Sequence, residues 1–143
     1  GVEMMKRARD VVEEEGDWRP WLIGVTLLTS LDAGDIARLG VEGSPSDQVR
    51  RLAAAAQEAG LDGVVCSPQE VEVLRQDCGP DFKLIVPGIR MKGESADDQK
   101  RVMTPSDALV HGADILVISR PIIRAADPAA AVENILADLP PAA

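Results

Sequence analysis

Four short apolar runs, separated by helical segments, constrain the fold of this chain more than any other feature. The runs cover residues 21–28, 63–66, 83–86 and 115–118. Each is too short for a helix and too continuously apolar for a strand with one solvated face, a pattern typical of strands buried on both sides of a parallel sheet. The sequence therefore predicts four parallel strands.

The segments between the runs carry start and stop signals for helices. A capping residue followed by proline opens each predicted helix, and glycine or proline closes it. The openings are Ser44-Pro45, Ser67-Pro68, Thr104-Pro105 and Asp127-Pro128, and the stops are Gly60, Gly79, Gly112 and Pro140. A further helix is predicted over residues 2–15, and an extra loop or short helix over 32–43. The predicted order is thus α-βα-βα-βα-βα.

The chain length limits what this order can build. A complete eight-fold βα barrel needs at least about 200 residues, and this chain has 143 and begins at Gly1. No low-complexity segment divides it, so a single domain over residues 1–143 is expected. Four βα units predict either half of a barrel or a small open α/β sheet. In both architectures, ligands bind beyond the carboxyl ends of the strands.

Composition excludes several classes of partner. Lys and Arg number 15 against 24 Asp and Glu, a formal charge of −9, which is the opposite of the basic surface expected for nucleic-acid binding or an anionic membrane. We expect no nucleic acid and no membrane as partners, and a cytoplasmic location. Cys66 and Cys78 lack metal-ligand spacing and are expected to be reduced thiols. His111, next to Gly112, is expected to contact a helix C-terminus and is assigned no role.

Two arginines follow the last two predicted strands. Arg90 and Arg120 could together clamp one phosphate with two guanidinium groups, although two ordinary surface salt bridges would place them equally well. Residues 90–103 contain glycine and many polar side chains. This segment fits either a lid that orders on ligand or a simple solvated loop.

Five motifs in order resemble bacterial orotidine 5'-monophosphate decarboxylases. They cover residues 28–30, 60–67, 87–90, 97–105 and 120–122, which read LTS, GLDGVVCS, PGIR, DDQKRVMTP and RPI. The resemblance extends over essentially the whole chain from Val2. It implies a fold of the (β/α)8 TIM barrel family, with this chain supplying four βα units, strands 5 to 8, from the C-terminal half of the barrel.

The resemblance also implies a function. The family converts orotidine 5'-monophosphate to uridine 5'-monophosphate in pyrimidine biosynthesis, as a homodimer and with neither metal nor organic cofactor. Arg90, Gln99 and Arg120 match positions that bind the 5'-phosphate, beside the backbone N–H groups of the Ser119 loop. Thr29 matches a polar contact to the pyrimidine edge.

Two departures from the family pattern qualify these expectations. The family's catalytic array of alternating Lys and Asp has no match here, so no catalytic residue is assigned in this chain and the chain alone is expected to be inactive. Ser119 stands where the family usually has glycine; its hydroxyl could donate a hydrogen bond, or its Cβ could crowd the phosphate. Two alternatives stay open: a non-catalytic phosphate-binding half-barrel module, and a related phosphosugar lyase or isomerase.

Overall fold

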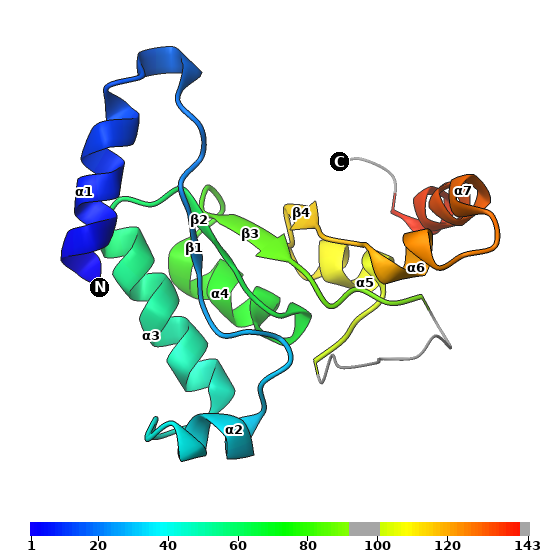
Figure 1. The fold of residues 1–143 in the computed structure, drawn as a ribbon, viewed down its shortest axis with the longest axis horizontal. Coiled ribbons are helices and arrows are strands. Elements are labelled where there is room, and N and C mark those ends of the chain that lie inside the picture. The colour runs from blue at the N-terminus through cyan, green and yellow to red at the C-terminus, as the bar shows by residue number, and fades with distance from the viewer. Residues whose placement is uncertain (92–100, 141–143) are drawn as a thin grey trace.

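Four parallel strands form one sheet in the order β1-β2-β3-β4 (Figure 1). The strands are β1 (Ile23–Val25), β2 (Gly63–Val65), β3 (Lys83–Val86) and β4 (Ile115–Leu116). The computed structural model describes residues 1–91 and 101–140. Strands that follow one another in sequence are neighbours in the sheet, which confirms the prediction of successive βα units. Each strand lies within one of the apolar runs.

The helices also follow the predicted order. The longer ones, except α4, begin directly after the predicted capping residues or at the N-terminus, and all of them end close to the predicted stops. They are α1 (Val2–Glu13), α3 (Pro45–Glu58), α4 (Val71–Cys78), α5 (Pro105–Val110) and α7 (Pro128–Asp138).

All four predicted caps are made by side chains, and at the 3₁₀ turn Ser67 accepts a hydrogen bond from the backbone N–H of Gln69. Ser44 accepts a hydrogen bond from the backbone N–H of Asp47, Thr104 accepts one from Asp107, and Asp127 accepts two from Ala129 and Ala130. These bonds satisfy N–H groups that have no partner within the helix.

Short helical turns account for the differences from the sequence prediction. The segment after Ser67 first forms a 3₁₀ turn, η2 (Pro68–Glu70), and only then α4, and another 3₁₀ turn, η1 (Gly16–Trp18), follows α1. Within 32–43, where a loop or a short helix is predicted, the chain forms the short helix α2 (Ala33–Arg38). After three residues beyond β4, where the sequence predicts a loop, α6 (Arg120–Ile123) begins, with Pro121 in its first turn, a position that proline tolerates.

One face of the sheet is covered by helices. Val64, Leu84 and Val86 point to this face and are fully buried, together with Val49 of α3 and Leu74 of α4. Helices α3 and α4 pack against each other and against β2 and β3. This layer holds the hydrophobic core.

The other face of the sheet is open. Side chains alternate along a strand, so the register row of Val25, Val65, Ile85 and Ile115 points away from the helices. Val25 is 64% exposed, Ile115 40% and Val117 46%. Burial of the strands on both sides, as their composition predicts, is therefore wrong for this chain as described. The open apolar face is the one that a half barrel would leave.

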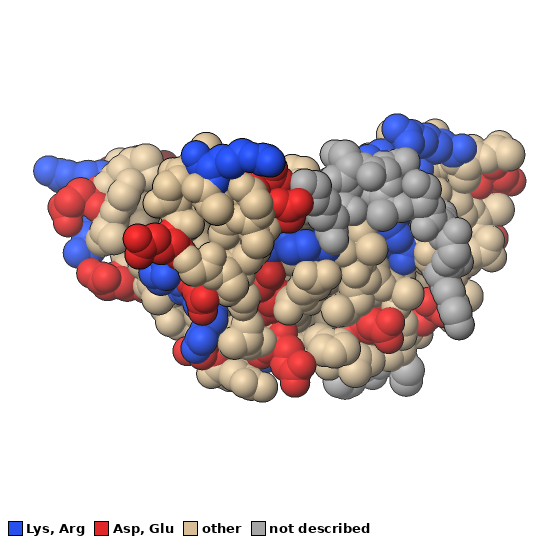
Figure 2. Space-filling model, turned by 90° about the horizontal axis from the view of Figure 1, so that it is seen from below, with Lys and Arg blue, Asp and Glu red and all other residues tan. Residues whose placement is uncertain are grey.

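Apolar hollows lie beside both outer strands of the described sheet. One, of about 410 Å³, is lined by side chains of α1, β1 and α3. The other, of about 470 Å³, is lined by side chains around β4, α6 and α7. None of the helices in residues 1–91 and 101–140 is long and apolar enough to cross a membrane. Acidic and basic side chains are interspersed on the face shown in Figure 2.

Candidate functional site

The candidate site lies where the carboxyl ends of the four strands meet. The segments that follow β1, β2, β3 and β4 leave the sheet at this edge, since all four strands run in parallel. They carry Thr29, Ser67, Arg90 and Arg120. Side chains far apart in the sequence are thus brought to one end of the sheet.

A glycine turn and a backbone hydrogen bond fix the position of Arg90. Gly88, with a φ of +81°, turns the chain after β3, a conformation that glycine adopts without strain. The Arg90 N–H then donates to the Met103 carbonyl at 3.0 Å, and Ile89 forms a parallel bridge with Met103. The Arg90 side chain is only 8% exposed, and its Nη1 donates to the Ile89 carbonyl at 2.7 Å. So deeply buried a guanidinium is uncommon and marks a candidate site.

Arg120 follows the neighbouring strand at the same number of residues as Arg90 follows β3. The register pairs Val86 of β3 with Leu116 of β4, and Arg90 and Arg120 each stand four positions beyond that pair (90 − 86 and 120 − 116). Arg120 is half-buried at the start of α6. Ser119 before it has a φ of −125°, so this backbone does not require glycine for its conformation.

Thr29 follows β1, an outer strand of the described sheet. It is 8% exposed and sits in a turn closed by a hydrogen bond from the Leu31 N–H to the Leu28 carbonyl, 3.0 Å long. Neighbouring strands are about 4.8 Å apart, so the ends of β1 and β3 are separated by about 10 Å and those of β1 and β4 by about 14 Å. Arg90 and Arg120 thus follow adjacent strands, whereas Thr29 follows β1, which is two strands away from β3.

Gln99 lies outside the described residues, as does most of the segment 90–103 that the sequence analysis interprets as a lid or a loop. Among the described residues, no group of three or more His, Cys, Asp or Glu side chains could hold a metal ion.

A buried ion pair joins the site, although the sequence analysis does not single it out. Glu70 in η2 and Arg101 are 3% and 5% exposed, and Arg101 Nη1 donates to Glu70 Oε1 at 2.7 Å. The Ser67 hydroxyl also donates to Glu70. The spacing of Ser67 and Glu70 is that of a capping box, which is the only sequence signal for this cluster. Nothing in the sequence pairs Glu70 with a residue 31 positions away.

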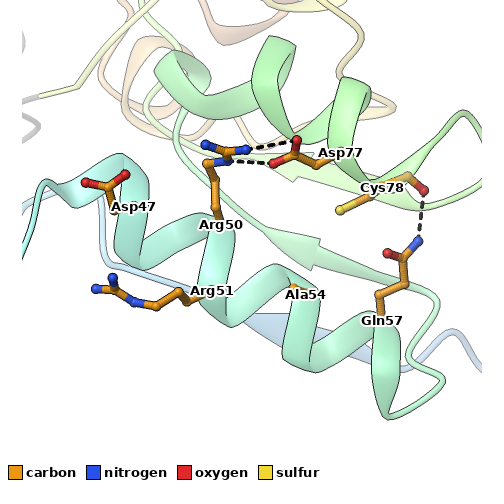
Figure 3. Close-up of a pocket in the computed structure, with 7 residues that line it drawn as sticks. All are labelled: Asp47, Arg50, Arg51, Ala54, Gln57, Asp77 and Cys78. Atoms are coloured by element: carbon orange, nitrogen blue, oxygen red, sulfur yellow. Dashed lines mark hydrogen bonds and ion pairs between the residues drawn. The ribbon is translucent and has the colours of Figure 1, made fainter.

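A separate groove between α3 and α4 is less suited to bind a ligand (Figure 3). Its most prominent cation, Arg50, is already bound to Asp77 through two hydrogen bonds of 2.6 and 3.1 Å, and Gln57 donates to the Cys78 carbonyl. Burial raises the pKa of the Cys78 thiol, which disfavours the reactive thiolate.

The remaining sequence predictions concern single residues. Cys66 and Cys78 are free thiols, as expected, and burial raises the pKa of Cys66 to about 12. His111 Nδ1 lies 2.6 Å from the Asp107 carbonyl oxygen at the C-terminus of α5. This contact confirms the predicted position of His111.

Comparison with known proteins gives one consistent result. Residues 1–135 match the model of the family "Orotidine 5'-phosphate decarboxylase / HUMPS family". The chain is 56% identical over 135 residues to orotidine 5'-phosphate decarboxylase of Glaesserella parasuis serovar 5 (strain SH0165), covering 94% of this chain and 59% of that protein. It is 54% identical over 140 residues to the enzyme of that name from Pasteurella multocida (strain Pm70), covering 98% and 60%.

Two solved structures are similar to this chain in fold and sequence. A crystal structure of orotidine 5'-phosphate decarboxylase from Lactobacillus acidophilus superposes with a TM-score of 0.78 at 36% identity, covering 96% of this chain and 58% of that one. An uncharacterized conserved protein from Geobacillus kaustophilus gives a TM-score of 0.77 at 31% identity, covering 98% and 60%. The chain thus spans about 60% of the length of the relatives it matches.

Proposed function

The chain belongs to the orotidine 5'-phosphate decarboxylase / HUMPS family, and from this premise we propose that it serves the decarboxylation of orotidine 5'-monophosphate to uridine 5'-monophosphate. The curated relatives at 56% and 54% identity carry the name of that enzyme. The reaction belongs to pyrimidine nucleotide biosynthesis, and the partner is accordingly a small nucleotide.

The phosphate site of this proposal consists of Arg90 and Arg120. Their equivalent positions beyond one register pair of β3 and β4 are the single observation that carries it. Two guanidinium groups at the ends of neighbouring strands can donate several charge-assisted hydrogen bonds to one phosphate. They do so locally, in a chain whose formal charge is −9. Gln99 and the Ser119 backbone are added to this site on the motif resemblance alone.

Thr29 is proposed to contact the pyrimidine edge. A nucleotide separates its phosphate from its base by a ribose, so the two ends need residues from different strands. The strand spacing of about 10 to 14 Å between the ends of β1 and those of β3 and β4 suits this separation. The low exposure of Thr29 also fits a hydroxyl that selects a base by hydrogen bonding.

The chemistry itself is proposed to depend on residues outside this chain. The Lys and Asp array of the family has no counterpart in the motifs quoted above, and the chain spans about 60% of its relatives. We infer that residues 1–143 form one unit, the C-terminal half of a barrel, that binds the nucleotide. Binding energy from the phosphate is then available far from the carbon that loses CO₂. A homodimer in the cytoplasm, without metal or organic cofactor, completes the proposal.

Arg120→Ala tests the phosphate site by the binding of uridine 5'-monophosphate, measured by isothermal titration calorimetry. Removal of a charge-assisted contact worth about 1.5 to 3 kcal/mol lowers the affinity roughly 10- to 100-fold. Arg124→Ala is the matched control, since it removes an exposed arginine one turn further on, and the affinity should stay within twofold. An unchanged affinity in Arg120→Ala would overturn the assignment.

The non-catalytic module remains a second candidate because of the missing Lys and Asp array. Incubation of the 143-residue chain with orotidine 5'-monophosphate, followed by chromatography of the nucleotides, tests this part. Formation of uridine 5'-monophosphate by the chain alone would contradict the inference that catalysis depends on residues outside it. Binding without turnover, in a longer protein that includes the rest of the barrel, would favour the module.

A further inference from the structure

The buried pair of Glu70 and Arg101 has no part in the function proposed so far. Charges this deeply buried lose their hydration, and an ion pair in such a place is often no more stabilising than apolar side chains of similar size. Arg101 Nε adds to that loss, because it is buried and has no hydrogen-bond partner among the described residues. Stability alone therefore does not account for the pair.

The remaining bonds of Arg101 indicate such a role. Its Nη2 donates to the Leu28 carbonyl at 3.0 Å and to the Leu27 carbonyl at 3.3 Å. The Leu28 carbonyl is also the acceptor that closes the turn of residues 28–31 through the Leu31 N–H. The guanidinium thus holds the backbone immediately before Thr29.

One side chain consequently connects three segments beyond the carboxyl ends of the strands. Arg101 itself precedes α5, Glu70 belongs to the segment after β2, and the Leu27 and Leu28 carbonyls belong to the segment after β1. Glu70 is fixed in turn by the Ser67 hydroxyl. The planar guanidinium can make these bonds at once, which an ammonium group on a flexible chain cannot reproduce.

We propose that Arg101 and Glu70 are positioning residues that hold the turn of Thr29 in the conformation that receives the pyrimidine base. The inference rests on the proposed function, since it assumes that Thr29 contacts the base. Neither residue touches the nucleotide. Their effect is on the base and not on the phosphate, which is bound from β3 and β4.

Arg101→Met, Arg101→Lys and Glu70→Gln test the proposal with two probes in calorimetric titrations. Uridine 5'-monophosphate has the base, whereas ribose 5-phosphate lacks it. Arg101→Met should weaken binding of uridine 5'-monophosphate by about tenfold, the loss expected for a misplaced hydrogen-bonding group, and leave binding of ribose 5-phosphate within twofold. Glu70→Gln should act in the same direction, and Arg101→Lys should restore part of the loss. Equal weakening of both probes, or of neither, would overturn the proposal.

Hydrogen exchange supplies a reading that does not depend on nucleotide binding. The Leu31 amide should exchange faster in Arg101→Lys than in the unaltered chain, because the Leu28 carbonyl loses the guanidinium that fixes it. Unchanged exchange at Leu31 would contradict positioning even if Arg101→Met failed to fold. If the unaltered chain bound neither probe while Leu31 responded, the proposed function would fail and the positioning of the turn would stand.

Discussion

Charged residues have different surroundings at the two ends of the sheet. At the carboxyl ends, Arg101 and Glu70 are buried among the loops of the candidate site. At the amino ends, Asp62 binds Arg19 through two hydrogen bonds of 2.9 and 2.8 Å and accepts the Leu22 N–H at 2.7 Å. The second cluster borders solvent and fixes the entry of the chain into β1. We therefore expect it to contribute to stability and not to ligand binding.

Asp62→Asn should lower the free energy of unfolding at neutral pH. The hydrogen bonds from Arg19, together with the Leu22 N–H and the charges of Arg19 and Arg9, hold the pKa of Asp62 down at about 2. A carboxyl whose pKa is lowered by folding stabilises the protein above its unfolded pKa of about 3.9, and this contribution is lost as the pH falls toward 2. Because the cluster borders solvent, we expect a difference of about 1 to 2 kcal/mol.

Urea unfolding of both proteins at pH 7, 5 and 3 checks this expectation. The difference between Asp62→Asn and the unaltered chain should be constant at pH 7 and 5 and smaller at pH 3. Asp81→Asn, which removes an exposed carboxylate, serves as the control for net charge. A difference that grew on acidification would contradict the assigned pKa direction.

Ser119→Gly should strengthen the binding of uridine 5'-monophosphate. Ser119 has a negative φ, so glycine would bring no relief of backbone strain, and any gain comes from removal of the Cβ beside the proposed phosphate. We expect a gain of roughly threefold, less than 1 kcal/mol, in a calorimetric titration. An unchanged or lower affinity would show that Ser119 does not crowd the phosphate.

At the scale of the elements, helix starts could be predicted from the sequence because they depend on neighbouring residues. Ser44, Thr104 and Asp127 all cap the helix that follows them. The strands could be placed because each lies in a short apolar run. Local spacing is sufficient for both kinds of element.

Other features could not be predicted from local spacing, and the clearest of them depend on contacts between residues far apart in the sequence. The pairing of Glu70 with Arg101 spans 31 positions and is visible only once β1, β2 and the start of α5 are brought together. Helix α6 is missed because the polar residues Ser119 and Arg120 after an apolar run are typical of a loop. The motif resemblance could name Arg90 and Arg120, but only the register gives their equivalent positions.

One local arrangement occurs twice at the amino ends of the strands. Asp62 before β2 accepts the Leu22 N–H, and Asp114 before β4 accepts the Leu84 N–H at 2.8 Å. Each aspartate also binds an arginine, Arg19 or Arg75. An aspartate directly before a strand therefore fixes the beginning of the neighbouring strand, and this helps to set the register on which the candidate site depends.

Gly63→Ala should disrupt the pairing of β2 with β3. A Cβ at Gly63 would lie 2.2 Å from the Lys83 carbonyl oxygen, so the two strands would have to move apart. We expect a loss of about 3 kcal/mol in urea unfolding, at the upper end of the usual effect of overpacking. Gly24→Ala is the matched control, because its Cβ would meet side chains and no backbone atom among its nearest contacts, 3.1 Å from Leu61 Cδ2, 3.4 Å from Ala56 Cβ and 3.6 Å from Val64 Cγ1. Equal losses would contradict a clash specific to the backbone.

At the scale of the whole molecule, the helices cover one face of the sheet and leave the other exposed. Val25, Ile115 and Val117 lie on the open side, and apolar hollows flank both outer strands of the described sheet. Contiguous apolar surface of this kind is uncommon on soluble monomers. The candidate site lies at the carboxyl end of the same sheet. A protein segment that covers the open face therefore also lies next to the site.

The 143-residue chain, studied alone, should self-associate through this open face. Its strands at the sheet edges have unpaired backbone groups and its open face has branched apolar side chains, both of which favour contact with another copy. Light scattering coupled to size-exclusion chromatography should give a mass above that of one chain, 15.2 kDa. Val25→Lys combined with Val117→Lys should reduce the mass toward the monomer, since two ammonium groups on the open face oppose burial.

Val110→Lys on α5 is the control, because Val110 is 72% exposed on a helix; it should leave the mass unchanged. A monomeric unaltered chain would mean that the open face needs no cover in solution, and the requirement for the rest of the barrel would then concern catalysis alone.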